Sequence, residues 1–440
     1  AEAAARYGEA RELLEHAGRC HQQAAQPAAA FDTRLVLADL LMEGGEFAAA
    51  YQVLDDLAGH APDADQRLRM TMQRMQVMAR DHDSGGAVRL AELTLADPFV
   101  LEDATPRRIA ELRWTLATCL RECGRAQAVL DELALAEPLL ALSPDATWRC
   151  WFHSQRATAL SLLGQVAAAA SAQELSVAAA REVGRHRMLA GCLQNSATLA
   201  TASGQLVECL ALLDECLSLM ADAGGTDAFT LHVRAQRGRA LVWLGRYREA
   251  LAVLEPLSDE SLGLPAYNRP RVLAALAELW THLGQPVRAD RMQATLAATP
   301  LDDFGRQLLA LSDEEIAWLT GRPPAPALTS AFEVTRHPTA THLATAQLLA
   351  WRRQDEPGDV EAVASRAAAW RAAGERGHAL MAEVIAAAWS ARRGRREAAA
   401  HHAGLALDAL HRLGMPGVYR PSLYLALVKA TGQAAELRER

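Results

Sequence analysis

Strand-forming patterns, aromatic residues and lysine are all scarce in this sequence of 440 residues. Aromatic residues make up 5% of the chain, and no run alternates valine, isoleucine or threonine with polar residues as a half-buried β-strand would. Alanine and leucine, which favour helices, are abundant instead. We therefore predict an all-α protein. Its length exceeds one ordinary core, so we expect several domains or one extended array.

Long hydrophobic runs are also missing. No stretch of about 18 uninterrupted apolar residues is present, so we predict no membrane-spanning helix, and the charged first turn is not that of a signal peptide. The seven cysteines are scattered without a C-x-x-C pair, which is typical of small buried side chains in a reducing compartment. These features predict a cytoplasmic location without a membrane partner. The chain starts without methionine inside a predicted helix, which is typical of a segment of a longer protein.

The formal net charge is −8, and it is unevenly spread. Residues 351–440 carry 14 Lys and Arg against 10 Asp and Glu, so the acidic excess lies earlier in the chain. An acidic body argues against direct binding of nucleic acid. The dense basic run ARRGRREA at 391–398 fits either a solvated helix end or a site for phosphate or an acidic partner.

Catalytic motifs are absent as well. The sequence has no G-x-x-x-x-G-K-[ST], G-x-S-x-G, H-E-x-x-H or EF-hand pattern, and its only lysine is Lys429. Cys119 and Cys123 lie one helical turn apart, but such a pair arises by chance in any long helix. We therefore predict a protein that is not an enzyme, and we assign no catalytic residue, no metal site and no cofactor.

A glycine returns at an interval of about 40 residues along the whole chain, which indicates an array of repeats. Glycine ends a helix readily because it adopts the left-handed conformation that other side chains resist. Each unit is therefore predicted to be two helices joined at a tight turn, in about eleven pairs. The repeated glycines are Gly45, Gly86, Gly124, Gly164, Gly204, Gly245, Gly284, Gly321, Gly358, Gly394 and Gly432.

Small residues recur at fixed distances on both sides of these glycines. Seven residues before the glycine lie Ala38, Ala79, Ala117, Ala157, Ala197, Gly238, Ala277 and Ala387. Five residues after it lie Ala50, Ala91, Ala169, Cys209, Ala250 and Ala399. Because interiors are close-packed, only small side chains fit where two antiparallel helices touch most closely. We expect both sets to be buried at the helix crossings.

This spacing resembles the tetratricopeptide repeat (TPR). That family's pattern of small residue, glycine, aromatic, alanine, apolar residue and proline is matched in the first full unit by Ala38, Gly45, Phe47, Ala50, Leu57 and Pro62. The resemblance implies a right-handed superhelical solenoid of antiparallel helix pairs. Less specifically, the chain is similar to the TPR-like sensor region of large bacterial transcription activators of the maltotriose-regulator (STAND ATPase) type.

Proline interrupts the pattern at residues 322–340. The composition of this segment predicts a loop, which is either a hinge between two superhelical segments or one degenerate repeat. We therefore divide the chain into a main superhelix at 1–321, this segment, and C-terminal repeats at 341–440.

The first helix of each pair is expected to line a concave face, where a partner would bind. In related repeats an asparagine grips the backbone of an extended peptide, so Asn195 has that role or is an amide bonded to the neighbouring helix. Arginine and tryptophan would also suit a small anionic or sugar-like effector. The candidate binding residues are Trp114, Arg121, Trp151, Gln194, Asn195, Thr198, His232, Gln236, Arg239, Trp243, Arg271, Glu278 and His282.

These observations favour a binding module that recognises a protein or peptide segment, or a small effector, as the sensor part of a larger bacterial regulator. Binding would shift a population between two curvatures or two states of self-association. A pure scaffold that uses its outer or terminal surfaces is the alternative. An enzyme with a site that matches no known motif is the third reading.

Overall fold

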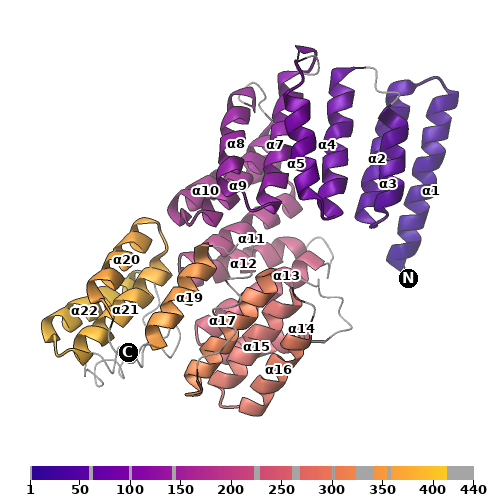
Figure 1. Cartoon of the computed structure of the whole chain (residues 1–440). Helices are drawn as coiled ribbons and strands as arrows, with labels where there is room; N and C mark the ends of the chain where they lie inside the picture. The colour runs from indigo at the N-terminus through magenta and orange to yellow at the C-terminus, as the bar shows by residue number, and fades with distance from the viewer. Residues whose placement is uncertain are drawn as a thin grey trace. The chain divides into compact units, whose positions relative to one another are not determined.

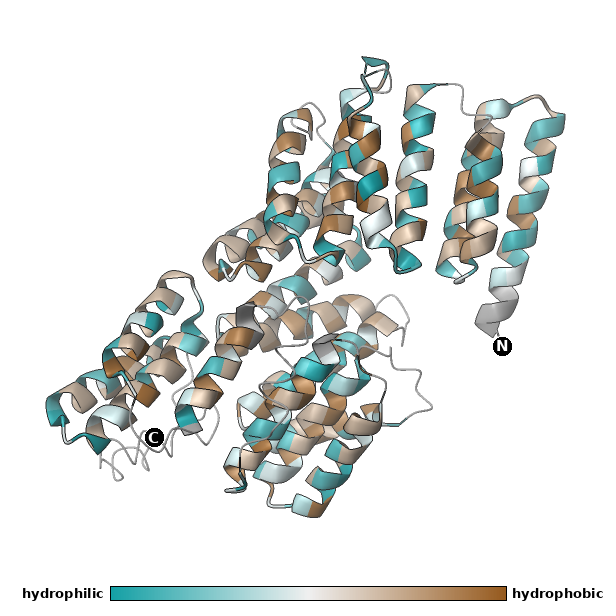
Figure 2. Ribbon diagram, in the orientation of Figure 1, coloured by the Kyte–Doolittle hydropathy of each residue, from teal (hydrophilic) through white to brown (hydrophobic). Residues whose placement is uncertain are grey.

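The computed structural model describes residues 2–58, 63–98, 102–140, 145–221, 228–259, 268–299, 301, 303–323, 340–353 and 358–413. Over these ranges the chain forms twenty α-helices and no strand, so the predicted all-α class is confirmed (Figure 1). Most helices carry both hydrophobic and hydrophilic residues along their length, as expected when one face packs and another meets solvent (Figure 2). None of the helices in the described ranges is long and apolar enough to cross a membrane.

The chain divides into two compact units, Ala1–Ala159 and Leu160–Arg440. The first unit contains α1 (Glu2–Gln23), α2 (Pro27–Glu43), α3 (Phe47–Ala58), α4 (Ala64–Arg80), α5 (Ser84–Leu95), α7 (Pro106–Glu122), α8 (Ala126–Leu140) and most of α9 (Ala146–Leu162). Within it, the pairs α2–α3, α4–α5 and α7–α8 are helical hairpins, and α2, α4 and α7 pack on one another as successive first helices.

The second unit is built on the same plan. Its helices are α10 (Val166–Val183), α11 (His186–Ala202), α12 (Leu206–Ala221), α13 (Ala228–Trp243), α14 (Tyr247–Leu257), α15 (Arg269–His282), α16 (Pro286–Ala298), α17 (Asp303–Leu319), α19 (Ala340–Arg353), α20 (Val360–Ala372), α21 (Arg376–Arg392) and α22 (Arg396–Arg412). The hairpins α11–α12, α13–α14, α15–α16 and α21–α22 are the most evident, and α13, α15 and α17 pack in sequence.

The turn within each hairpin is closed by a residue in the left-handed conformation. At Gly45, with φ of 76°, the glycine N–H donates to the carbonyl of Met42 and the next N–H, of Glu46, donates to that of Leu41. These two bonds satisfy carbonyls that the end of the helix leaves unpaired. The predicted turn glycines with positive φ are Gly45, Gly124, Gly164, Gly204, Gly245, Gly284, Gly321 and Gly394.

One glycine of the predicted series is wrong. Gly86 lies inside α5, because the Asp83 side chain accepts a hydrogen bond from the Gly86 N–H at 2.8 Å and starts the helix early. The left-handed residue of that turn is His82, with φ of 64°. Gly358 lies two residues before the start of α20, as Gly45 lies two residues before the start of α3, but residues 354–357 of its turn lie outside the described part of the chain. Predicted positions Pro62 and Gly432 lie outside the described residues.

The small residues lie at the helix crossings as predicted. Those before the turn that are buried are Ala38, Ala117, Ala157, Ala197, Gly238, Ala277 and Ala387. Those after the turn that are buried are Ala50, Ala91, Ala169, Cys209, Ala250 and Ala399. Ala79 is the exception and is only half-buried, because the shift of the turn to His82 puts Met75 at the crossing instead.

The break predicted at 322–340 stays a prediction, since residues 324–339 lie outside the described part of the chain. The boundary between the two compact units falls elsewhere, inside α9. It lies between Ala159 and Leu160.

Candidate ligand-binding face

The candidate residues from the sequence all lie on first helices of the hairpins, and none is buried. In the first unit they are Trp114 and Arg121 on α7 and Trp151 on α9. In the second unit they are Gln194, Asn195 and Thr198 on α11, His232, Gln236, Arg239 and Trp243 on α13, and Arg271, Glu278 and His282 on α15. Trp151 and Thr198 are exposed, and the others are half-buried. The candidate residues therefore fall in both compact units.

Three tryptophans form the aromatic part of the face in the first unit. The ring centroids of Trp114 and Trp151 lie 5.8 Å apart, and Trp148 meets both edge-on at 5.8 and 5.5 Å. Trp148 is buried, whereas Trp151 is 41% exposed. Sequence reasoning missed Trp148, although its position three residues before Trp151 places both on one side of a helix. The cluster offers a rigid apolar surface with one open ring.

One helical turn further along, the same first helices carry polar groups. Arg121 Nη1 donates to Gln155 Oε1 at 3.0 Å, and Gln155 Nε2 donates to Thr118 Oγ1 at 3.0 Å. Arg121 also bonds Glu122 at 2.8 Å. Gln155, which the sequence did not single out, therefore links α9 to α7 alongside the tryptophan cluster.

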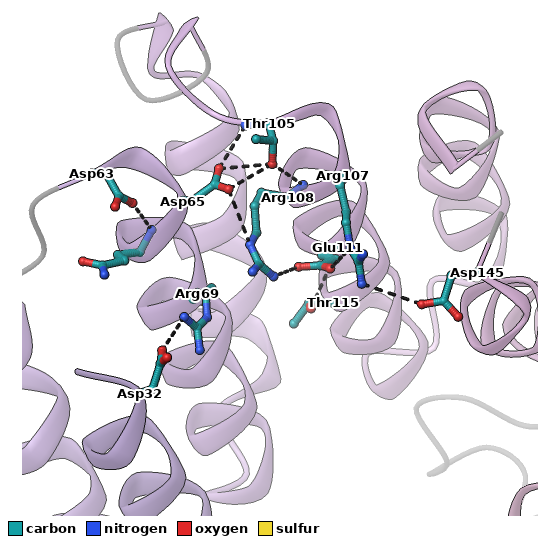
Figure 3. Close-up of polar contacts among 11 residues, drawn as sticks. Asp32, Asp63, Asp65, Arg69, Thr105, Arg107, Arg108, Glu111, Thr115 and Asp145 are labelled. Atoms are coloured by element: carbon teal, nitrogen blue, oxygen red, sulfur yellow. Dashed lines mark hydrogen bonds and ion pairs between the residues drawn. The ribbon is translucent and has the colours of Figure 1, made fainter. Parts of the chain in front are cut away.

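Charged residues join the first helices of this unit near their N-termini (Figure 3). Asp32 on α2 accepts a hydrogen bond from Arg69 on α4 at 2.6 Å. Asp65 on α4 in turn accepts the backbone N–H of Thr105, the N-cap of α7, at 2.9 Å and lies 3.8 Å from Arg108. Each step of the array is therefore linked to the next by an Asp–Arg or Asp–Thr contact.

A buried carboxylate lies in the middle of this set. The side chain of Glu111 is 9% exposed, contacts Arg108 and accepts a hydrogen bond from Arg107 Nε at 3.0 Å. Arg107 also reaches Asp145, next to the start of α9, at 3.7 Å (Figure 3). These arginines are matched by carboxylates, so this end of the face holds the repeats together and presents little unbalanced charge.

An amide network joins α11 to α13 in the second unit. Gln194 Nε2 donates to Gln236 Oε1 at 3.0 Å and to Thr198 Oγ1 at 3.1 Å, and Gln236 Nε2 donates to Thr198 Oγ1 at 3.0 Å. The structure thus brings together three of the predicted residues from two neighbouring first helices. Asn195 lies beside Gln194 on α11 and is half-buried.

One turn along α13, the guanidinium carbon of Arg239 lies 4.3 Å from the ring centroid of Trp243. Such a cation–π contact orients both side chains. His232, at the other end of the helix, contacts Asn268 at 2.7 Å. Burial lowers the pKa of His232, and although the bond to Asn268 opposes this, the nearby Arg271 charge adds to the lowering. His232 is therefore neutral at pH 7 and adds no charge to the face.

The imidazole ring of His282, on α15, contacts the preceding hairpin. It stacks on Tyr247, the first residue of α14, at 5.2 Å and 14°. Burial raises the pKa of the Tyr247 hydroxyl to about 12, so this tyrosine stays neutral. His282 thus packs toward the turn of the preceding hairpin. The described residues contain no group of three or more His, Cys, Asp or Glu side chains that could hold a metal ion.

Comparison with known proteins places the fold. No family model matches the chain, and no curated protein matches it by sequence. Among solved structures, a Rap protein complexed with Competence and Sporulation Factor is 13% identical with a TM-score of 0.53, covering 87% of this chain and 98% of that one. The quorum sensor NprR from B. thuringiensis, in its apo form, is 13% identical with a TM-score of 0.50, covering 86% and 98%.

A structure of NprR in complex with its cognate peptide NprX is 14% identical with a TM-score of 0.51, covering 73% of this chain and 92% of that one. The chain has a TPR-like solenoid fold. At these identities the likeness is one of fold. The narrower resemblance to the sensor regions of maltotriose-type regulators is not confirmed by these comparisons.

Proposed function

We propose that this chain is a peptide-binding module whose ligand lies along the first helices of the second unit. The observation that carries the proposal is the network of Gln194, Thr198 and Gln236, which spans two adjacent first helices and is only half-buried. An extended peptide presents alternating N–H and C=O groups. A side-chain amide both donates and accepts, so it matches either.

A peptide can replace the hydrogen bonds of this network at a small cost in free energy. Each of the three network bonds joins uncharged groups, and such a bond contributes about 1 kcal/mol net. A peptide that replaces them with bonds of the same kind loses little and gains the burial of its own apolar side chains. Asn195, one residue from Gln194, extends the same row of amides along α11.

The solved structures of similar fold support a peptide as the class of ligand, since one of them holds NprR with its cognate peptide NprX. We extend that class to this chain as a proposal. Arg239 and Trp243 lie one and two turns beyond Gln236 on α13, where they would meet a carboxylate or an aromatic side chain of the ligand. A small anionic or sugar-like effector is a competing ligand for these two residues.

In the first unit, the Trp114–Trp148–Trp151 cluster provides a separate apolar anchor point. Tryptophan faces bind flat apolar groups with little loss of side-chain entropy. We propose the whole chain as the sensor part of a larger bacterial regulator in the cytoplasm, in which the ligand shifts a population between two arrangements.

A library of displayed linear peptides, selected on the full chain, tests the peptide proposal. Selected peptides are then titrated by calorimetry against the wild type and against a variant that combines Asn195→Ala, Arg239→Ala and Trp243→Ala. We expect the variant to bind at least about tenfold more weakly, because it loses several contacts of about 1 kcal/mol each. Helicity by circular dichroism checks that the variant is folded.

The matched control is Gln127→Ala, which removes an exposed amide from the second helix α8. Its affinity should equal that of the wild type. Peptides that bind the triple variant and the wild type equally would exclude Asn195, Arg239 and Trp243 from the site. Equal binding by a second variant, Gln194→Ala with Gln236→Ala, would exclude the first-helix face itself. Loss of binding in Gln127→Ala would instead favour the scaffold alternative, in which outer surfaces bind the partner.

A further inference from the structure

The start of α10 and the end of α20 are joined by a backbone hydrogen bond in the second unit. The N–H of Ala167 donates to the carbonyl of Ala373 at 3.0 Å. Ala167 is the second residue of α10, and Ala373 is the C-cap of α20. Neither group has a partner within its own helix, because the first N–H groups and last carbonyls of a helix are left over. The positive end of one helix dipole also meets the negative end of the other.

Two glycines allow this close approach. A Cβ added at Gly374, where φ is 87°, would lie 2.7 Å from the Ala167 nitrogen. A Cβ added at Gly204, where φ is 81°, would lie 2.9 Å from the Cα of Gly377. The two backbone segments therefore touch at a distance that no side chain would permit. We call the contact of Ala373, Gly374 and Gly377 with Ala167 and Gly204 the clasp.

An apolar cluster supports the clasp from behind. Leu206, at the start of α12, is fully buried together with Trp370 of α20 and Leu380 of α21. Trp243 and Leu244, at the end of α13, pack against the same cluster. The clasp is therefore part of a continuous buried surface and not an isolated touch between two turns.

The clasp makes the packing of this unit circular. The helices pack in the order α10, α11, α12, α13, α15, α17, α19 and α21. The clasp then returns from α20 and α21 to α10 and the turn before α12. In an ordinary repeat array each unit touches only its neighbours, so stability is a sum of local terms. Here the last repeats also depend on the first ones.

We propose that the clasp opens and closes as a two-state element, and that ligand binding on α11 and α13 is coupled to it. Trp243 is the link: it holds Arg239 on the ligand face and packs against the cluster behind the clasp. Closure fixes Trp243, and through it Arg239, in the arrangement that a ligand meets. By linkage, a ligand that prefers this arrangement favours the closed clasp. The coupling to a ligand rests on the proposed function, whereas the opening and closing of the clasp does not.

Amide hydrogen exchange of the full chain, without ligand, tests the clasp. An N–H in the first turn of a helix normally exchanges fast, because it bonds only water. Ala167 should exchange at least about tenfold more slowly than Glu397, the equivalent second residue of α22, because its N–H is held by Ala373. Equal rates at the two amides in the wild type would overturn the proposal.

Two variants should open the clasp, and two others control for the backbone strain that any side chain causes at a left-handed turn residue. Gly374→Ala and Gly204→Ala should each raise the exchange rate at Ala167 toward that of Glu397. Gly394→Ala and Gly284→Ala carry the same left-handed strain, with φ of 73° and 67°, but an added Cβ meets nothing within 4 Å. They should leave Ala167 protected. Equal exchange in all four variants would show that turn strain, and not the clasp, is being measured.

Peptides selected from the displayed library test the coupling. Gly374→Ala should weaken their binding several-fold, although Gly374 is not one of the ligand-face residues, and Gly394→Ala should not. If both variants bind as the wild type does, the coupling is refuted and the clasp stands on the exchange data alone. If no peptide is selected, the peptide proposal fails, while the exchange experiment still decides whether the clasp forms.

Discussion

A Cβ atom at Gly238 would lie 2.5 Å from Cδ2 of Leu254, so the first helix α13 and the second helix α14 touch at a point where only hydrogen fits. Leu254 itself is fully buried. The equivalent positions in other hairpins hold buried alanines, such as Ala38, Ala117 and Ala197. The relationship gives a direct test of the repeat register.

Gly238→Ala should destabilise the protein by about 1–3 kcal/mol, because the added methyl group overpacks the crossing. Gly191→Ala, also within a helix but with nothing within 4 Å of an added Cβ, should instead stabilise it by about 0.5–1 kcal/mol. Urea denaturation followed by circular dichroism measures both. If both substitutions changed the stability in the same direction, the two helices would not cross at Gly238.

Thiol reactivity should separate one cysteine from the rest. Cys20 is exposed, whereas burial raises the pKa of Cys119 to about 12 and those of Cys209 and Cys216 to about 11. The thiolate is the reactive form, so a raised pKa slows reaction. We expect one fast thiol with Ellman's reagent at pH 8, and its loss in Cys20→Ser. Cys123 is half-buried and burial raises its pKa, so it should react more slowly than Cys20. A fast phase that survives both Cys20→Ser and Cys123→Ser would contradict the burial of the other five cysteines.

Asp313 should make the stability of the protein depend on pH. Burial raises the pKa of its carboxyl to about 6, and Gln293 Nε2 donates to its Oδ1 at 2.6 Å. In the unfolded chain an aspartate carboxyl has a pKa of about 3.9. Between about pH 4 and pH 6 the unfolded chain has therefore lost this proton while the folded protein keeps it, so the contribution of Asp313 to wild-type stability falls as pH rises. Asp313→Asn keeps the acceptor for Gln293 and cannot titrate.

The variant should therefore gain stability relative to the wild type on going from pH 4 to pH 7. The measurement is the difference in urea midpoint between the two proteins at each pH. A difference that is the same at both values would mean that Asp313 titrates normally in the folded state.

The charged contacts of the first unit should differ widely in their contributions. Glu111 is buried and meets two arginines, so Glu111→Gln should cost about 1–3 kcal/mol by removing the carboxylate that both contact, while Arg107 keeps Asp145 and Arg108 keeps Asp65. Asp32, whose side chain is 55% exposed, pairs with Arg69 in solvent, and Asp32→Asn should cost less than about 1 kcal/mol. Thermal denaturation ranks the two. A larger loss in the Asp32 variant would contradict the burial of Glu111.

The fold was predictable because its signal is periodic. A glycine at the turn and small residues at the crossings repeat from Ala38 to Ala399, so the same pattern predicts one hairpin after another. The error in the glycine series arises from an aspartate, since Asp83 caps α5 and the helix it starts includes Gly86. A histidine with φ of 64° at position 82 has no counterpart in the repeat pattern.

The candidate face was predictable only in part. Helical spacing placed Gln194 and Gln236 on accessible first-helix faces, but it could not show that they bond each other. Trp148 and Gln155 were missed because each is buried by partners on a neighbouring helix that the sequence does not identify. The bond from Ala167 to Ala373 links residues far apart in the chain, and nothing periodic marks it.

Circular packing has a consequence for how such a chain changes over evolutionary time. An open array tolerates the gain or loss of a hairpin, because the ends are free to move apart. One additional hairpin between Ala167 and Ala373 would carry α20 away from α10 by at least the width of one helix, about 10 Å. A chain that keeps the clasp must therefore keep the number of hairpins between its two ends, and we expect added hairpins to be tolerated only outside this stretch.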